Sequence, residues 1–218
     1  MKSFKTILAA AFTVFASSAI AAPITSNPTF TNDGLSFDSF TCHITKGGIF
    51  ATPSKCSQID VSADTSPAKG LNITSSFVAA PLSFDDSLLT YHVHADAGKI
   101  SSIELDFDGF FLGLAVASVT ETVKNSHGTV VGFLTVSCST FGCDRQDPPY
   151  EAFDIPLTGT YTDLYVTKDI NVTGVLGFGE QSIIHQGYTL VPEPASLALL
   201  GSGLLGLGAL GRRKRKAA

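Results

Sequence analysis

Apolar and polar residues alternate with a period of two along most of the chain. The clearest case is residues 89–96, where leucine, tyrosine, valine and alanine take turns with polar residues, and residues 103–108 repeat the pattern. Successive side chains of a β-strand point to opposite faces, so this alternation predicts strands with one buried face. Between residues 22 and 190 no segment keeps helical spacing, and turn-forming residues interrupt the pattern about every eight to twelve positions. The pattern predicts an all-β fold, an antiparallel β-sandwich of jelly-roll-like type.

The same pattern locates the other strands. They are predicted at residues 35–44, 71–79, 112–123, 128–137, 163–167, 171–178 and 183–190. The segment 125–128 (Asn-Ser-His-Gly) is predicted to form the turn between two of them. This region has no tryptophan and holds most of the 16 phenylalanines, which favours a core of aromatic side chains between two sheets.

The first 21 residues have the three parts of a secretory signal peptide. Lys2 and Lys5 supply the positive start, residues 7–15 are apolar, and Ala19 and Ala21 place small residues before the cleavage point. We expect signal peptidase to cut after Ala21. An uncleaved membrane anchor is the alternative, but the apolar run is short for a span and hydroxyl residues dilute it.

The C-terminal end combines a proline motif, an uncharged segment and a basic cluster. The motif is Val191, Pro192, Glu193 and Pro194, and the basic cluster is Arg212, Arg213, Lys214, Arg215 and Lys216. As a helix, the uncharged residues 195–210 would reach about 24 Å, somewhat less than a hydrocarbon core of ~30 Å, and long basic side chains can extend to the headgroups. The positive-inside rule then predicts a single transmembrane helix with the body outside and the basic cluster in the cytoplasm.

These three parts, in this order, resemble the tail of the PEP-CTERM family of exported proteins. The resemblance covers residues 191–216, about an eighth of the chain. It implies that an exosortase, a membrane-embedded peptidase, cuts near the motif after a transient inner-membrane stage, and that the product reaches the cell surface or the extracellular matrix. The expected division is a signal peptide at 1–21, an exported domain at 22–190 and a sorting tail at 191–218. A rigid linker above a permanent anchor is the alternative.

Charge separates the exported domain from the two ends. The chain has 14 Lys and Arg against 19 Asp and Glu, but half of the basic residues lie in the signal peptide and the basic cluster. The domain between them is therefore strongly acidic, with a net charge near −11. Such a domain repels phosphate backbones, which excludes nucleic acid as an expected partner.

Four cysteines lie in the exported part, and an even number in an oxidising compartment favours two disulfides. Of the three possible connectivities, we predict Cys42 with Cys56 and Cys138 with Cys143. The first would close a 15-residue loop, contributing roughly 3 kcal/mol in the chain-entropy model. Neither pair has the close spacing typical of a zinc site.

Two groups of polar residues are candidate sites. His92 and His94 share one face of a predicted strand and could share a metal, although both are on its polar phase and we expect them to face solvent. Glu104, Asp106 and Asp108 share the polar face of another strand, where paired carboxylates can serve glycoside hydrolysis or calcium binding. A charged solvent face is the simpler interpretation. We therefore predict no metal or catalytic site in either group.

Carboxylates in predicted loops are further candidates for binding a cation. Asp85, Asp86, Asp144 and Asp147 are predicted to lie in loops, where hard cations often find ligands, but no spacing matches a known calcium motif. Nucleophile and phosphate-loop motifs are absent.

We expect an exported, non-enzymatic surface or matrix protein without a cofactor. The alternatives are a carbohydrate-binding or carbohydrate-active sandwich, with extracellular polysaccharide as candidate partner, and a calcium-stabilised adhesion module.

Overall fold

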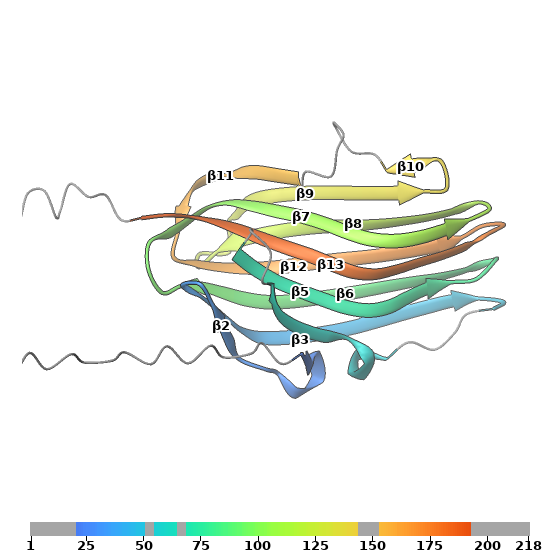
Figure 1. Cartoon of the computed structure of the whole chain (residues 1–218), viewed down its shortest axis with the longest axis horizontal. Coiled ribbons are helices and arrows are strands. Elements are labelled where there is room, and N and C mark those ends of the chain that lie inside the picture. Colours follow the sequence, from blue (N-terminus) through green and yellow to red (C-terminus); the bar gives the residue numbers. More distant parts are fainter. Residues whose placement is uncertain (1–20, 51–54, 65–68, 144–152, 193–218) are drawn as a thin grey trace, which may run out of the picture.

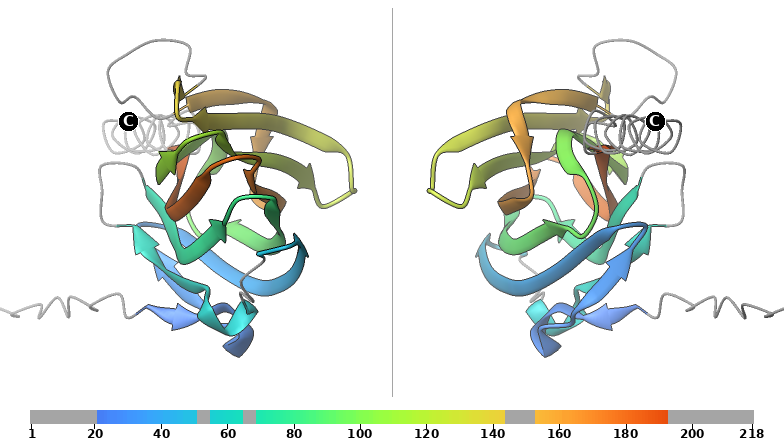
Figure 2. Two further views of the ribbon diagram at one scale, coloured as in Figure 1. Left: turned by 90° about the vertical axis from the view of Figure 1, so that its right-hand side faces the viewer. Right: turned by 90° about the vertical axis from the view of Figure 1, so that its left-hand side faces the viewer.

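A computed structural model describes residues 21–50, 55–64, 69–143 and 153–192, which form two stacked antiparallel sheets (Figures 1 and 2). The strands are β1 (Ala22–Pro23), β2 (Phe30–Asn32), β3 (Leu35–Gly48), β4 (Asp60–Asp64), β5 (Lys69–Ala79), β6 (Ser83–Ala95), β7 (Lys99–Leu112), β8 (Ala115–Asn125), β9 (Val130–Ser139), β10 (Gly142–Cys143), β11 (Phe153–Tyr161), β12 (Asp163–Gly174) and β13 (Phe178–Val191), with 3-10 turns at Ile24–Ser26 and Cys56–Gln58. One sheet has the order β1-β4-β5-β13-β7-β11 and the other β10-β9-β8-β12-β6-β3-β2. The predicted all-β sandwich is confirmed.

The last two strands occupy inner positions in the two sheets. β12 pairs with β6 on one side and β8 on the other, and β13 pairs with β5 and β7. Neither sheet is therefore complete without one of these two strands, and the sheet that contains β13 needs the residues just before the sorting motif. Many consecutive strands belong to different sheets, so the turns that join them cross from one sheet to the other. These turns gather at the two ends of the sandwich (Figure 1).

Alternation explains which residues fill the space between the sheets. In β6 and β12 every second residue is buried, as a strand with one face on the core requires. Phe37, Phe77 and Phe107 are fully buried, which agrees with the predicted aromatic core. Each contributes on the order of 2 kcal/mol relative to an exposed side chain.

Some predicted strand limits were wrong. The predicted strand 112–123 begins only at Ala115, because Leu112 ends β7 and Gly113 turns the chain at a φ of 68°. The segments 163–167 and 171–178 are not separate strands: β12 runs through Lys168 and Asp169, and its turn into β13 begins after Gly174. Five short or edge strands were not predicted, namely β1, β2, β4, β10 and β11.

The prediction that Asp85 and Asp86 lie in loops is wrong, because both lie in β6. Asp85 points into the sandwich and is fully buried, whereas Asp86 faces outward and is partly buried. Burial, together with the nearby charge of Asp169, raises the pKa of the Asp86 carboxyl. Asp144 and Asp147 lie outside the described residues.

Both predicted address segments fall almost entirely outside the described residues. This holds for the signal peptide 1–21 apart from its last residue, and for the tail beyond Pro192, including the predicted helix at 195–210 and the basic cluster. Within the described ranges, no helix has the length and apolar character needed to span a membrane.

Candidate functional site

The sorting motif begins on the last strand of the sandwich. Val191 is the final residue of β13 and still pairs with Lys99 of β7, and Pro192 follows directly. Proline lacks a backbone N–H and disfavours helical geometry in the residue before it, which suits both the extended Val191 and the end of the strand. The motif is thus attached to the fold without an intervening linker.

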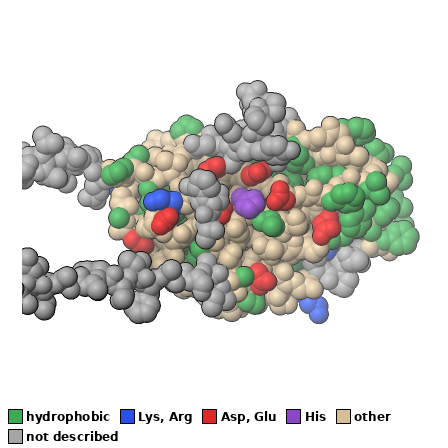
Figure 3. All heavy atoms as spheres, viewed as in Figure 1, with side chains coloured by type: hydrophobic (Ala, Val, Ile, Leu, Met, Phe, Trp, Pro, Cys, Tyr) green, Lys and Arg blue, Asp and Glu red, His purple; other side chains and the backbone are tan. Residues whose placement is uncertain are grey.

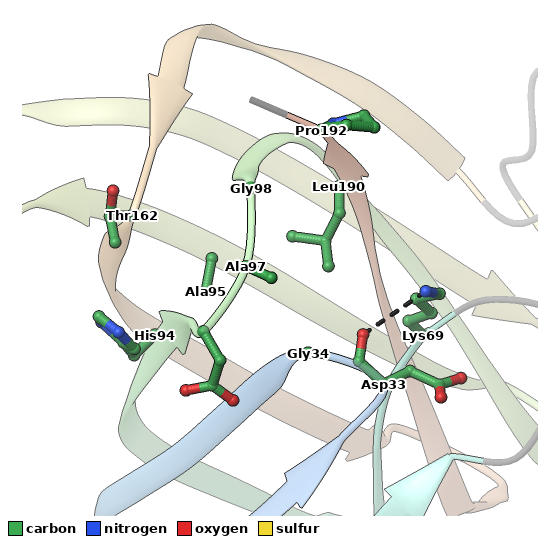
Figure 4. A pocket seen from close by; sticks show the side chains of 11 residues that line it. Asp33, Gly34, Lys69, His94, Ala95, Ala97, Gly98, Thr162, Leu190 and Pro192 are labelled. Carbon is green, nitrogen blue, oxygen red and sulfur yellow. Dashed lines mark hydrogen bonds between the residues drawn. The ribbon is translucent and has the colours of Figure 1, made fainter. Parts of the chain in front are cut away.

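Pro192 lines a shallow pocket of about 790 Å³ at this end of the sandwich (Figure 4). The pocket lies between the β2–β3 turn and the β6–β7 turn, and its polar lining includes Asp33, Lys69 and His94. The Lys69 ammonium donates to the Asp33 carbonyl at 3.5 Å, as the dashed line in Figure 4 shows. The start of the motif therefore lies beside a partly polar surface.

His92 and His94 lie on the outer face of β6, which is the polar phase of the predicted strand, and both contact carboxylates from neighbouring strands. His94 Nδ1 lies 2.8 Å from Asp163 Oδ1, and His92 lies between Asp38 at 3.2 Å and Asp163 at 3.3 Å. The Asp163 pKa is lowered mainly by the hydrogen bond from His94. The His92 ring also packs against Tyr165, with ring centroids 4.9 Å apart. The arrangement is a surface cluster of histidine and carboxylate side chains joining β3, β6 and β12.

The carboxylates of β7 face outward, as predicted, and one of them meets a histidine from the next strand. His185 Nε2 lies 3.6 Å from Asp108 Oδ2, and its Nδ1 lies 3.6 Å from Asp64 Oδ2 and 2.8 Å from the Asn72 amide oxygen. Glu104 and Asp106 are partly buried on the same face. Within the described residues no group of three or more His, Cys, Asp or Glu side chains has the geometry to hold a metal ion.

The end of the sandwich opposite Pro192 carries a cluster of exposed apolar side chains, here called the apolar tip (Figure 3). It contains most of the large exposed hydrophobic side chains among the described residues. Its members are Ile49, Phe50, Leu82, Phe84, Phe110, Leu112, Leu114, Val116, Phe141, Val175 and Leu176. The segments that carry them, 47–50, 79–84, 109–118, 137–143 and 172–179, contain no Asp, Glu, Lys or Arg.

Backbone hydrogen bonds join the turns of the apolar tip into one surface. Ile49 N–H donates to the Leu82 carbonyl at 3.1 Å, and Leu82 N–H donates to Val175 at 3.3 Å. Val175 N–H donates in turn to Leu114 at 2.9 Å, and the Thr140 hydroxyl donates to the Gly113 carbonyl. These bonds hold the turns side by side, and their apolar side chains gather at this end of the sandwich (Figure 3). An apolar patch of this kind is a candidate interaction surface.

A second unpredicted feature is a charged cluster in the core. Lys168 of β12, Glu121 of β8 and Gln186 of β13 are all fully buried. The Lys168 ammonium donates to Glu121 Oε2 at 2.7 Å and to the Gln186 side-chain oxygen. Beside them the hydroxyls of Tyr91 and Tyr188 lie 2.7 Å apart, and burial raises both tyrosine pKa values well above their usual range.

Another buried ion pair ties β3 to β6. Lys46 Nζ lies 2.8 Å from Asp85 Oδ2, and the Ser87 hydroxyl donates to Asp85 Oδ1 at 3.0 Å. The Asp85 side chain is fully buried and that of Lys46 is 11% exposed. Taking a carboxylate out of water is costly, so the lysine is needed to compensate its charge.

The four cysteines form the two predicted disulfides. Cys42–Cys56 connects β3 to the 3-10 turn before β4, and Cys138–Cys143 links β9 to β10. No cysteine is free. The predicted disulfide framework is confirmed.

Comparison with protein families identifies a PEP-CTERM protein-sorting motif at residues 190–216. The class of protein follows from this match: the chain is an exported protein whose tail is of the kind processed by an exosortase and routed to the cell surface. The match covers Val191, Pro192, Glu193, Pro194 and the basic cluster, which agrees with the sequence prediction. No curated protein matches the chain in sequence.

Similarities to solved structures are weak. TmCBM61 in complex with beta-1,4-galactotriose has 8% identity and a TM-score of 0.30, covering 67% of this chain and 88% of that one. The carbohydrate-binding module CBM36 with calcium and xylotriose has 10% identity and a TM-score of 0.26, covering 68% and 99%. A loop-swap mutant of Xyn11A from Necallimastix patriciarum has 9% identity and a TM-score of 0.28, covering 79% and 100%. Similarities of this size assign no ligand or activity to the chain.

Proposed function

We propose that this protein is a non-enzymatic module of the cell surface or the extracellular polysaccharide layer, released from a transient inner-membrane stage by exosortase cleavage at its tail. The observation that carries the proposal is the direct continuation of an inner strand, β13, into the sorting motif. Because β13 lies between β5 and β7, the sandwich includes the chain up to Val191, so a cut within the motif leaves its strands intact. The histidine–carboxylate contacts around His92 and His185 join neighbouring strands, which supports a role in sheet stability.

The test is the mass of the mature protein isolated from cells that possess an exosortase. We expect an N-terminus at Ala22 and a C-terminus near residues 191–194, which is the result of two cleavages. Recovery of surface protein that still ends at Ala218 would refute sorting and leave a permanent anchor as the function of the tail.

The apolar tip supports a second, more specific function, which is docking on a lipid surface. β13 extends over 14 residues, so the tip lies about 45 Å from the sorting motif and faces away from the membrane that holds the precursor. Carbohydrates require hydrogen-bonding partners, whereas the tip offers phenylalanine, leucine, valine and isoleucine on uncharged turns. The turns of the apolar tip project from both sheets and lack charge. They suit insertion among the acyl chains of a bilayer, because a charged group there would oppose insertion.

We expect the mature protein to float with phosphatidylcholine vesicles and the variant F110S/L112S/F141S to lose at least tenfold in binding. Each apolar side chain that no longer enters the bilayer costs on the order of 1.5 kcal/mol or more of binding free energy. The loss of three such side chains therefore weakens binding by more than tenfold. Phe133→Ser is the matched control, because Phe133 is 60% exposed on β9 away from the tip. Undiminished binding by the triple variant would contradict lipid docking. A tip-dependent dimer without vesicle binding would assign the surface to a second copy instead.

A further inference from the structure

The buried cluster of Lys168, Glu121 and Gln186 brings together an amine, a carboxyl group and an amide from three strands. β8 and β12 belong to one sheet and β13 to the other, so the cluster spans the interior of the sandwich. Each of the three side chains is fully buried. The Lys168 nitrogen contacts both the Glu121 carboxylate and the side-chain oxygen of Gln186.

Burial drives this amine and this carboxyl toward their neutral forms. It lowers the pKa of Lys168 and raises the pKa of Glu121, in each case against the opposing effect of the partner charge. A proton moved from Lys168 to Glu121 leaves an uncharged amine, which is a nucleophile, beside an amide carbonyl. Both groups meet at the same ammonium, because Lys168 Nζ contacts Glu121 Oε2 and the Gln186 side-chain oxygen, so the carboxyl can serve the amine and the amide.

We propose that Lys168 and Gln186 form an intramolecular isopeptide bond, with Glu121 carrying the proton. Lys168 Nζ attacks Gln186 Cδ and forms a new C–N bond. Glu121 takes a proton from the attacking nitrogen and delivers one to the departing amide nitrogen, which leaves as ammonia. The C–N bond of the amide breaks, nothing is oxidised or reduced, and no co-reactant is needed. The fixed positions of the reacting groups replace the encounter that makes this reaction slow in water.

Such a bond would connect the two sheets at their inner strands. β13 carries the sorting motif at its end, so in the uncut precursor any force applied through the tail acts first on this strand. Neither disulfide involves β13, because one connects β3 to the turn before β4 and the other β9 to β10. Without the isopeptide bond, only hydrogen bonds and packing hold β13 in place. The isopeptide bond would add a covalent connection to this strand.

The test is the intact mass of the mature protein after disulfide reduction. We expect a deficit equal to one ammonia, about 17 Da, relative to the sequence between its measured ends. A protease that cuts after glutamate separates the two residues at Glu180, so the fragments on either side should remain linked in the denatured, reduced protein. A full mass with separate fragments would overturn the proposal and leave a buried ion pair.

Variants distinguish the bond from the ion pair. Glu121→Gln preserves the shape of the side chain but removes the proton carrier, so we expect the full mass, separate fragments and a melting temperature lower by roughly 5–10 °C. Lys168→Met should likewise show the full mass. The control Glu104→Gln changes a carboxylate on the outer face of β7 and should keep the deficit. A deficit that persists in Lys168→Met would overturn the assignment of the nucleophile, and one that persists in Glu121→Gln would overturn that of the proton carrier.

Discussion

Replacing Pro192, Glu193 and Pro194 with alanine is expected to abolish C-terminal processing while export and membrane insertion continue. The two prolines fix φ, remove two backbone donors and keep the residues before them extended. Alanine is the best helix former, so the variant segment is expected to extend the helix predicted at 195–210 and withdraw from a peptidase groove. Intact mass measured in a host with an exosortase should then give a protein ending at Ala218, whereas the wild type ends near the motif.

Neutral residues at 212–216 provide the complementary variant. A 16-residue apolar helix is a marginal anchor, so without its basic cluster the tail should pass through the membrane and the unprocessed protein should be secreted. The two variants therefore accumulate the same uncut chain in different places, one in the membrane and one outside. Normal processing of the alanine variant would show that the peptidase does not depend on the extended motif.

Much of the fold could be predicted because binary alternation directly encodes which strand face is buried. Residues 89–96 illustrate this, since the apolar phase of the pattern is the buried phase of β6. The alternation was least informative for short strands such as β1 and β10, which have two residues each. The prediction of strand limits also failed in β12, where the polar pair Lys168 and Asp169 indicated a turn between two strands.

The buried charges are visible in the alternation pattern of the sequence. Glu121 stands on the apolar phase between Val119 and Val123, and Lys168 stands on that phase between Val166 and Ile170. A charged residue on the buried phase is costly unless it has a partner, so each position predicts a partner somewhere in the core. Which partner it is cannot be read from one strand, because the cluster joins strands from both sheets.

The apolar tip and the histidine clusters depend on topology rather than on local pattern. Five segments far apart in the sequence supply the tip, and none of them is unusual alone. His92 acquires its partners from β3 and β12, on either side of its own strand. Such groupings follow from strand order, which alternation does not determine.

Removing the cation of the Lys46–Asp85 pair is expected to cause a large loss of stability. Lys46→Met leaves Asp85 fully buried with its hydroxyl donor Ser87 but without the lysine, and breaking a buried pair in this way costs about 3–5 kcal/mol. In a domain of this size that cost corresponds to a fall in melting temperature of roughly 10 °C.

The double variant Lys46→Met with Asp85→Leu decides whether the buried charge is the cause. Replacing both members of a buried pair with apolar residues is often close to neutral, so the double variant should recover most of the lost free energy of unfolding. Urea unfolding measures each variant, with Lys124→Met, an exposed lysine on β8, as the control that should change stability by less than about 0.5 kcal/mol. If the double variant is as unstable as the single one, the loss arises from the packing of the Lys46 side chain and not from an uncompensated carboxylate.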